Sequence, residues 1–310
     1  MTRSIWVTGA DGFIGRHLLD LLSRQPDIRV GALGFRRQAS SRIDDGSGPL
    51  WEEGEIDEAR LDALATTMGP PDIVYHLAGG GSVGASYADP QLDFRRTALS
   101  TAAITDWLRR RAPNARLVQI SSAAIYGAGH DAPIPEDARL DPFSPYGAHK
   151  LIAETLCHSA RANFALDTWI IRPFSVYGPG LRKQLLWDSC SRLASGCAEL
   201  TLGGNGAERR DWLHVTDLCA LLWQIADMSP ADGTTLNAGT GKATTVDEIA
   251  RMLVAAWGNP ALPIRFSGDC RRGDPFSLVA DTDRLSRLGF AAQQDVRSGI
   301  ADYVDWFRGQ

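Results

Sequence analysis

The first half of the chain alternates short apolar runs with segments of helical periodicity. Ser4–Thr8 is an apolar run, and the leucines of Arg16–Leu22 recur at the spacing of one helix face. Further strand-like runs follow at Ile28–Leu33, Pro49–Glu52, Asp72–Gly79 and Ala115–Ser122. Apolar strands separated by helices are typical of a parallel sheet covered on both faces. The pattern therefore predicts an α/β fold built on a doubly wound parallel sheet.

The alternation breaks up beyond Pro173. Lys183–Leu193 has helical spacing, and Thr235–Gly239 reads as a strand. Thr245 followed by Glu248 has the spacing of a capping box, which predicts the start of a helix. We expect this half to form a smaller lobe.

Three glycines lie between the first predicted strand and the first predicted helix. Gly9, Gly12 and Gly15 follow the strand directly, and this context makes a Rossmann dinucleotide-binding turn credible. The glycines allow a tight turn, and the helix N-terminus favours a pyrophosphate. An NAD site would place Asp or Glu after the second strand, but Arg36 and Arg37 stand there. We therefore expect NADP to be favoured over NAD, unless both arginines are solvated loop charges.

Three further residues carry candidate acid–base chemistry. Ser122 ends a predicted strand, at the edge where ligands bind in such sheets. Tyr146 and Lys150 are four residues apart at the start of a predicted helix, so they share one face. A nearby ammonium lowers the pKa of a phenol, which suits a general base. His149 is expected to be structural.

The chain resembles the extended short-chain dehydrogenase/reductase family, in its nucleotide-sugar epimerase/dehydratase branch. The similar segments are Ser122–Gly127, Ser144–Lys150, Ile171–Pro179, Arg210–Asp217 and Arg271–Asp274. The resemblance implies a dinucleotide-binding domain at 1–172, with returns at about 211–240, and a substrate lobe for a nucleoside-diphosphate sugar at 173–310. It also implies a homodimer formed through helices near 92–111 and 146–163.

The resemblance assigns residue roles as well. It implies that Ser122, Tyr146 and Lys150 are catalytic. It implies contacts with the cofactor from Gly9, Gly12, Phe13, Ile14, Gly15, Arg36, Arg37, Glu55, Ile56, Leu77, Ala78, Gly79, Tyr146, Lys150 and Pro173. It implies contacts with the substrate from Ser82, Ser122, Ser175, Arg210 and Arg271.

Departures from the family pattern narrow the chemistry. Dehydratases carry acidic residues directly after the catalytic serine or threonine, whereas this chain has Ala123 and Ala124. Methyl groups cannot move protons, so 4,6-dehydration is disfavoured. The family often has Asn where this chain has Asp93 and Ser175, and usually Asp where it has Glu55.

Three functions are compatible with these residues. The first is a C4 epimerase that acts on a nucleoside-diphosphate sugar through a 4-keto intermediate. The second is an NADPH-dependent reductase of a 4-keto sugar nucleotide, which the expected NADP preference favours. The third is a cofactor-sensing protein without turnover, against which the complete set of Ser122, Tyr146 and Lys150 argues.

Composition excludes several other classes. The chain has 310 residues and a net charge of −5 without a basic block, which argues against nucleic acid as a partner. No run is long enough for a membrane helix, and we expect no signal peptide and a cytoplasmic location. Five cysteines in no metal-binding spacing suit reduced thiols, and six scattered histidines lead us to expect no metal site.

Overall fold

The computed structural model describes residues 2–35, 48–229, 235–269 and 274–310. The chain divides into two compact units. The first, here called the sheet unit, contains Met1–Tyr126, Leu140–Arg172 and Cys219–Leu236. The second unit contains Gly127–Arg139, Pro173–Leu218 and Asn237–Gln310. Each is described by itself.

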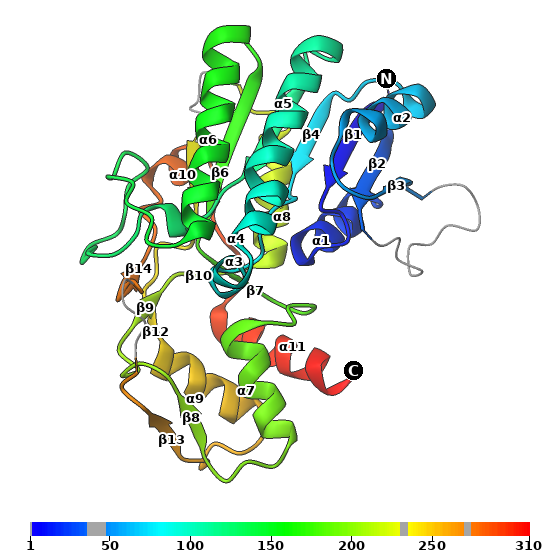
Figure 1. Cartoon of the computed structure of the whole chain (residues 1–310). Helices are drawn as coiled ribbons and strands as arrows, with labels where there is room; N and C mark the ends of the chain where they lie inside the picture. Colours follow the sequence, from blue (N-terminus) through cyan, green and yellow to red (C-terminus); the bar gives the residue numbers. More distant parts are fainter. Residues whose placement is uncertain (1, 36–47, 230–234, 270–273) are drawn as a thin grey trace. The chain divides into compact units, whose positions relative to one another are not determined.

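A seven-stranded sheet forms the centre of the sheet unit (Figure 1), in the order β11-β6-β5-β4-β1-β2-β3. The pairings that join β6 to β3 through the sheet are all parallel. The strand order reverses between β1 and β4, and this is where such folds bind dinucleotides. The strands are β1 Arg3–Thr8, β2 Ile28–Gly34, β3 Leu50–Glu53, β4 Ile73–His76, β5 Arg116–Ile120, β6 Asp167–Pro173 and β11 Thr235–Ala238. The predicted parallel Rossmann sheet is confirmed.

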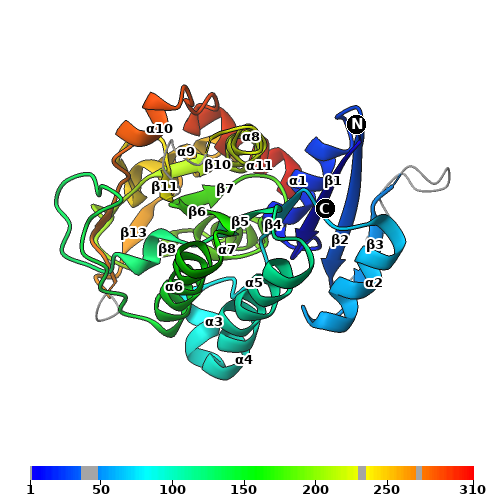
Figure 2. The ribbon, with the colours of Figure 1, turned by 90° about the horizontal axis from the view of Figure 1, so that it is seen from above.

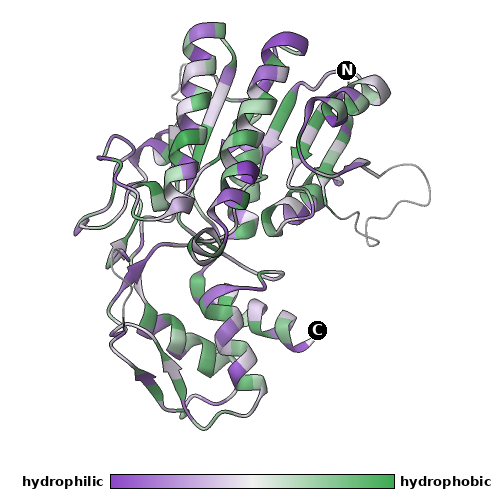
Figure 3. Cartoon of the chain, in the orientation of Figure 1, coloured by the Kyte–Doolittle hydropathy of each residue, from purple (hydrophilic) through white to green (hydrophobic). Residues whose placement is uncertain are grey.

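Helices cover both faces of this sheet. Figure 2 shows α5 and α6 on one face, and α1 and α8 on the other. Figure 3 shows hydrophobic and hydrophilic residues along both α5 and α6, as expected of helices that bury one side. The helices are α1 Phe13–Leu22, α2 Glu58–Met68, α3 Val83–Ala88, α4 Pro90–Phe94, the π-helix η1 Arg95–Leu99, α5 Ser100–Arg111, the 3₁₀ turn η2 Ala123–Ile125, α6 Pro145–Phe164 and α8 Val215–Ile225.

Large aromatic and aliphatic side chains fill the space between the sheet and its helices. Trp6 of β1 and Trp107 of α5 are both buried, and their rings lie 5.2 Å apart. They belong to one core cluster that also includes Leu61 and Leu64 of α2. This packing fixes the ends of β1 and β4, which carry the candidate site.

The second unit is built from short strands and four helices in its described part. The Thr245 side chain and Glu248 form the predicted capping box at the start of α9. Asp211 is fully buried and accepts hydrogen bonds from the backbone of Thr240, Gly241 and Ala280, which ties three segments together. The elements are β7 Ser175–Tyr177, α7 Gln184–Ala194, β8 Leu200–Leu202, β9 Arg209–Arg210, β10 Trp212–His214, β12 Thr244–Thr245, α9 Val246–Ala256, β13 Ile264–Phe266, β14 Ser277–Leu278, α10 Asp283–Arg287 and α11 Val296–Arg308.

Candidate active site

The glycine loop after β1 needs glycine for steric reasons. Gly9 has a φ of +65°, and a Cβ there would lie 2.7 Å from the backbone N of Ala78, which follows β4. A Cβ on Gly15 would lie 2.3 Å from the carbonyl oxygen of Gly9. Real Cβ atoms do not approach backbone so closely. Glycine at these positions therefore lets α1 begin tightly against the ends of β1 and β4.

The start of α1 fits the pyrophosphate of a dinucleotide. Gly12 is the N-cap of α1, and it has no side chain to cap the N–H groups of the first turn. A Cβ on Gly12 would lie 3.0 Å from the Gly9 carbonyl oxygen, so glycine also suits this position. Free N–H groups and the positive end of the helix dipole bind anions. The residues present therefore suit a nicotinamide dinucleotide.

A carboxylate lies at the end of β2, although it does not come from β2. A Cβ on Gly34 would lie 2.4 Å from Oδ1 of Asp11, a residue of the glycine loop. The next residue, Phe35, is half exposed, and the Arg96 guanidinium lies 4.9 Å from its ring centroid. Arg36 and Arg37, on which the NADP prediction depends, lie outside the described residues. The sequence analysis looked for a carboxylate after the second strand, and it therefore did not identify Asp11.

A buried histidine ends β4. His76 Nδ1 lies 2.7 Å from the hydroxyl of Thr8, and Nε2 lies 3.2 Å from that of Thr101. Burial first, and then the charge of Lys150, lower the pKa of His76 to about 3. The imidazole therefore stays neutral at physiological pH and joins the ends of β1 and β4 to α5 through hydrogen bonds.

Ser122, Tyr146 and Lys150 come together within the sheet unit. Ser122 follows β5, and its hydroxyl hydrogen-bonds the phenol of Tyr146. Lys150 is buried, and its ammonium donates to the carbonyl oxygen of Ile120 at 2.9 Å. The ammonium lies 5.9 Å from the Tyr146 ring centroid. A Cβ on Gly79 would lie 2.9 Å from the same ammonium, so this glycine makes room for Lys150.

Local sequence explains how this group is placed. Ser144 caps α6 by accepting a hydrogen bond from the backbone of Gly147, and Pro145 occupies the first turn of the helix. The backbone N–H of Tyr146 donates to the hydroxyl of Ser86 at 3.0 Å. Ser144 and Pro145 thus begin the helix that carries both Tyr146 and Lys150.

The pKa of Tyr146 departs from the sequence argument. Burial raises this pKa, the hydrogen bond with Ser122 lowers it, and the negative charge of Asp93 raises it, with a net rise. The lowering by Lys150 that the sequence predicted is not among these causes. Asp93 and its partner His149 are therefore functional candidates. The sequence analysis treated Asp93 only as a departure from the family pattern, and His149 only as a structural residue.

The remaining predicted residues fall into three groups. Phe13, Ile14, Glu55, Ile56, Leu77 and Ser82 belong to the sheet unit, where Ser82 caps α3. Pro173, Ser175 and Arg210 belong to the second unit, where Arg210 donates to the carbonyl oxygens of Arg209 and Phe276. Arg271 lies outside the described residues.

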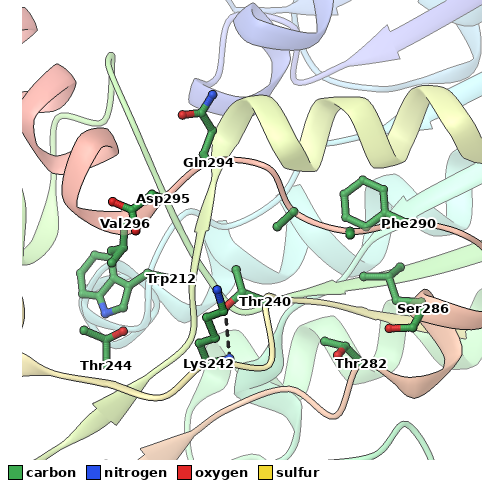
Figure 4. Close-up of a pocket in the computed structure, with 14 residues that line it drawn as sticks. Trp212, Thr240, Lys242, Thr244, Thr282, Ser286, Phe290, Gln294, Asp295 and Val296 are labelled. Atoms are coloured by element: carbon green, nitrogen blue, oxygen red, sulfur yellow. Dashed lines mark hydrogen bonds between the residues drawn. The ribbon is translucent and has the colours of Figure 1, made fainter.

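The second unit also contains a cavity of about 290 Å³. Figure 4 shows Trp212, Thr240, Lys242 and Asp295 among its lining residues. The hydrogen bond drawn there joins the Lys242 N–H to the Thr240 hydroxyl, at 3.2 Å. Among the described residues, no cluster of three or more His, Cys, Asp or Glu could hold a metal ion. No helix in the same residues is long and apolar enough to cross a membrane.

Comparison with known proteins decides the family. The model of the NAD-dependent epimerase/dehydratase family matches residues 5–239. The chain belongs to this family. A UDP-glucose 4-epimerase of Azospirillum brasilense is 32% identical to it over 98% of this chain and 92% of the relative. A dTDP-glucose 4,6-dehydratase of Streptomyces griseus is 29% identical over 99% of this chain and 94% of the relative.

Solved structures agree with this family membership. The structure of MoeE5 in complex with UDP-glucose and NAD has a TM-score of 0.85 and 31% identity, and covers 99% of each chain. The resemblance predicted from the motifs is confirmed. The family is NAD-dependent and this neighbour carries NAD, so the comparisons do not favour NADP over NAD as the sequence prediction did.

Proposed function

We propose that this chain is an NAD-dependent epimerase that inverts C4 of a nucleoside-diphosphate sugar through a 4-keto intermediate. The observation that carries the proposal is the hydrogen bond between Ser122 and Tyr146, with the Lys150 ammonium of α6 lying beside Gly79, which follows β4. This group lies beside the glycine loop that suits a dinucleotide.

The glycine loop would hold the dinucleotide, which would supply hydride acceptance and hydride donation at C4 of the sugar. Inversion would follow from rotation of the 4-keto sugar between the two transfers, which presents its other face. Tyr146 takes the proton of the 4-hydroxyl as the hydride leaves, and gives it back when the alcohol forms again. Ser122 already bonds the phenol, so it can hold the sugar oxygen beside it. Lys150 is fixed by the Ile120 carbonyl, which keeps a positive charge close to the reacting phenol.

The residues after Ser122 separate this chemistry from dehydration. Ala123 is buried, and the backbone N–H of Ala124 donates to the Ser122 hydroxyl at 3.2 Å. Neither side chain can serve as the acid or base that loss of water requires. We therefore propose epimerisation, although dehydratases are also among the relatives.

We propose that the sheet unit holds the dinucleotide and that the second unit binds the sugar nucleotide. Arg210 supports this assignment, because a guanidinium binds phosphate oxygens in a bidentate way. Ser175 would add a hydroxyl donor. UDP-glucose is the first substrate to test, because it is named for both the Azospirillum brasilense relative and the MoeE5 complex.

The cofactor proposal rests on Asp11. Its carboxylate lies against Gly34, at the end of β2, where a dinucleotide presents its adenosine ribose. A carboxylate accepts hydrogen bonds from ribose hydroxyls and repels a 2′-phosphate. NAD is therefore expected, whereas NADP would support the sequence argument from Arg36 and Arg37.

We also propose a homodimer that uses helices of the sheet unit. Among the large apolar side chains exposed on them are Phe94 of α4, Leu99 of η1 and Ile152 of α6, each more than 40% exposed. Exposed apolar groups gathered on neighbouring helices mark protein interfaces.

The testing experiment begins with denaturation of the purified protein and identification of the dinucleotide released. Stoichiometric NAD supports an epimerase, which must retain its cofactor between the two hydride transfers. An empty protein that binds NADPH reversibly and reduces a 4-keto sugar nucleotide would support the reductase instead.

Turnover is then measured by separating C4 epimers after incubation with UDP-glucose, UDP-glucuronic acid and dTDP-glucose. Tyr146→Phe is expected to lower kcat by about 10²–10⁴-fold, with the dinucleotide retained. Tyr87→Phe is the matched control, because the exposed Tyr87 hydroxyl bonds only the Phe143 carbonyl among the described contacts. Unchanged turnover in Tyr146→Phe would refute the assigned proton transfer.

A further inference from the structure

The N-terminus of α6 depends on a hydrogen bond to a distant segment. The N–H groups of the first turn of a helix have no partner inside the helix. Pro145 has no N–H, and the N–H of Gly147 donates to the Ser144 hydroxyl at 3.1 Å. The N–H of Tyr146 lies between them, and it donates at 3.0 Å to the hydroxyl of Ser86, which is 60 positions earlier in the chain. A local cap and a residue of α3, which lies beside α6 (Figure 2), therefore share the first turn of α6.

The direction of the Ser86 hydroxyl follows from its two partners. A backbone N–H only donates, so the Ser86 oxygen accepts the hydrogen bond from Tyr146. The hydroxyl hydrogen goes to the carbonyl oxygen of Val83, one turn earlier in α3, at 2.8 Å. The exposure of Ser86 is 0%, so water does not reach this hydroxyl and cannot take its place beside Tyr146. The acceptor for Tyr146 is thus fixed in position by α3.

A second contact holds α6 one turn further along. Lys150 lies four residues after Tyr146, and its ammonium donates to the carbonyl oxygen of Ile120, the last residue of β5. The phenol of Tyr146 meets the hydroxyl of Ser122, two residues beyond Ile120. Ser86 holds the backbone of Tyr146, and Ile120 holds the same helix against the strand end that precedes Ser122. The position of the phenol relative to Ser122 therefore depends on contacts with two separate elements, α3 and β5.

We propose that Ser86 is a positioning residue, which holds Tyr146 where its phenol reaches Ser122 and the 4-hydroxyl of the sugar. The Ser86 hydroxyl is engaged by Val83 and by the backbone of Tyr146, so it acts on the reaction through Tyr146. The role in turnover rests on the proposed function. Displacing a reacting group by about 1 Å can cost a factor of about 10² in rate, so the loss of this one hydrogen bond should be visible in kcat.

Thr105 of α5 offers a comparison with a buried hydroxyl whose printed contacts lie within one helix. It is 7% exposed, and its hydroxyl donates to the carbonyl oxygens of Thr101 and Ala102, at 2.8 and 3.1 Å. Removing a hydrogen-bonded hydroxyl from either place should lower the stability of the sheet unit. If Ser86 served stability alone, its loss would have the same consequences as the loss of the Thr105 hydroxyl. A positioning role adds an effect on Tyr146 that Thr105 lacks.

The test compares Ser86→Ala with Thr105→Val by nuclear magnetic resonance of the tyrosine rings. The chain has six tyrosines, so a protein labelled with carbon-13 at the tyrosine Cζ gives six signals, and Tyr146→Phe identifies the signal of Tyr146. Ser122→Ala shows where that signal lies once the hydrogen bond to the phenol is lost. We expect Ser86→Ala to move the Tyr146 signal towards that position, and Thr105→Val to leave it in place. An unmoved Tyr146 signal in Ser86→Ala would overturn the proposal.

Kinetics of the same variants give a second readout. Ser86→Ala should lower kcat by about 10–100-fold, with KM and the retained dinucleotide close to those of the parent protein. Thr105→Val should keep the kcat of the parent, and circular dichroism at the assay temperature checks that both variants are folded. A kcat no lower in Ser86→Ala than in Thr105→Val would overturn the proposal.

The parent protein alone also tests the contact. The N–H of Tyr146 should exchange slowly with deuterium, because its acceptor is buried, and exchange as fast as that of an exposed N–H would overturn the proposal. Neither this exchange nor the Tyr146 signal needs turnover. A moved signal in a protein that epimerises nothing would therefore refute the proposed function and leave the positioning of Tyr146 by Ser86 established. Epimerisation with an unmoved signal would do the reverse.

Discussion

Replacing Glu154 by glutamine should strongly destabilise the sheet unit. Glu154 of α6 and Arg172 of β6 are 1% and 4% exposed, and the guanidinium meets both carboxylate oxygens, at 3.0 and 2.7 Å. A third N–H of Arg172 donates to the Tyr126 hydroxyl at 2.8 Å. This cluster anchors α6, the helix that carries Tyr146 and Lys150, to the sheet.

The magnitude follows from the burial of the pair. Removing one partner of a buried ion pair costs about 3–5 kcal/mol, because the other charge is left without compensation. Glutamine keeps one oxygen that can accept a hydrogen bond from Arg172. We therefore expect a loss at the lower end of this range, about 3 kcal/mol of unfolding free energy. For a unit of this size that corresponds to a fall in the thermal midpoint of roughly 6–12 °C.

The assay is thermal unfolding followed by circular dichroism, with two comparisons. Asp20→Asn breaks the exposed pair with Arg24, and should cost no more than about 0.5 kcal/mol. The double replacement Glu154→Leu with Arg172→Met removes both charges, and should be less destabilising than Glu154→Gln. The reasoning is refuted if Glu154→Gln behaves like Asp20→Asn, or if the double variant is the least stable of the three.

Three further outcomes are expected. Gly15→Ala should reduce the dinucleotide retained per protein at least about tenfold, because its Cβ would lie 2.3 Å from the Gly9 carbonyl oxygen. Gly309→Ala is the control, since a Cβ has space there, and it should retain the dinucleotide. Equal retention in the two variants would contradict this reasoning. Burial and a nearby ammonium hold the pKa of His76 at about 3, below the 6.5 of the unfolded chain, so its contribution to stability is complete above pH 6.5. That contribution should fall by about 1.4 kcal/mol per pH unit between 6.5 and 3, and urea unfolding of His76→Asn should lack this slope. Leu99→Lys should turn a dimer into a monomer in light scattering after gel filtration; a wild-type monomer would contradict the interface.

Sequence periodicity located the sheet well. The predicted strands Ile28–Leu33 and Ala115–Ser122 appear as Ile28–Gly34 and Arg116–Ile120. Buried parallel strands are continuous apolar runs, and their glycine or serine ends mark where they stop. The helix from Pro145 was equally evident, since its cap and its proline are local signals.

Contacts between distant segments were not visible in the sequence. The carboxylate at the end of β2 was sought about 20 residues beyond the glycine loop, but Asp11 of the loop itself lies there. His149 was set aside as structural, because its partner Asp93 is 56 residues away. No spacing rule connects residues on two different helices.

The sequence by itself determined the class of the fold, the glycine loop, and the candidates Ser122, Tyr146 and Lys150, because strand ends, helix caps and i, i+4 spacing are local properties of the chain. The tertiary structure alone decided the electrostatics around Tyr146. Burial, the Ile120 carbonyl that holds Lys150 and the carboxylate of Asp93 all come from segments that only folding brings together. A pKa depends on every charge and every desolvated atom within a few ångströms, and these neighbours are set by packing.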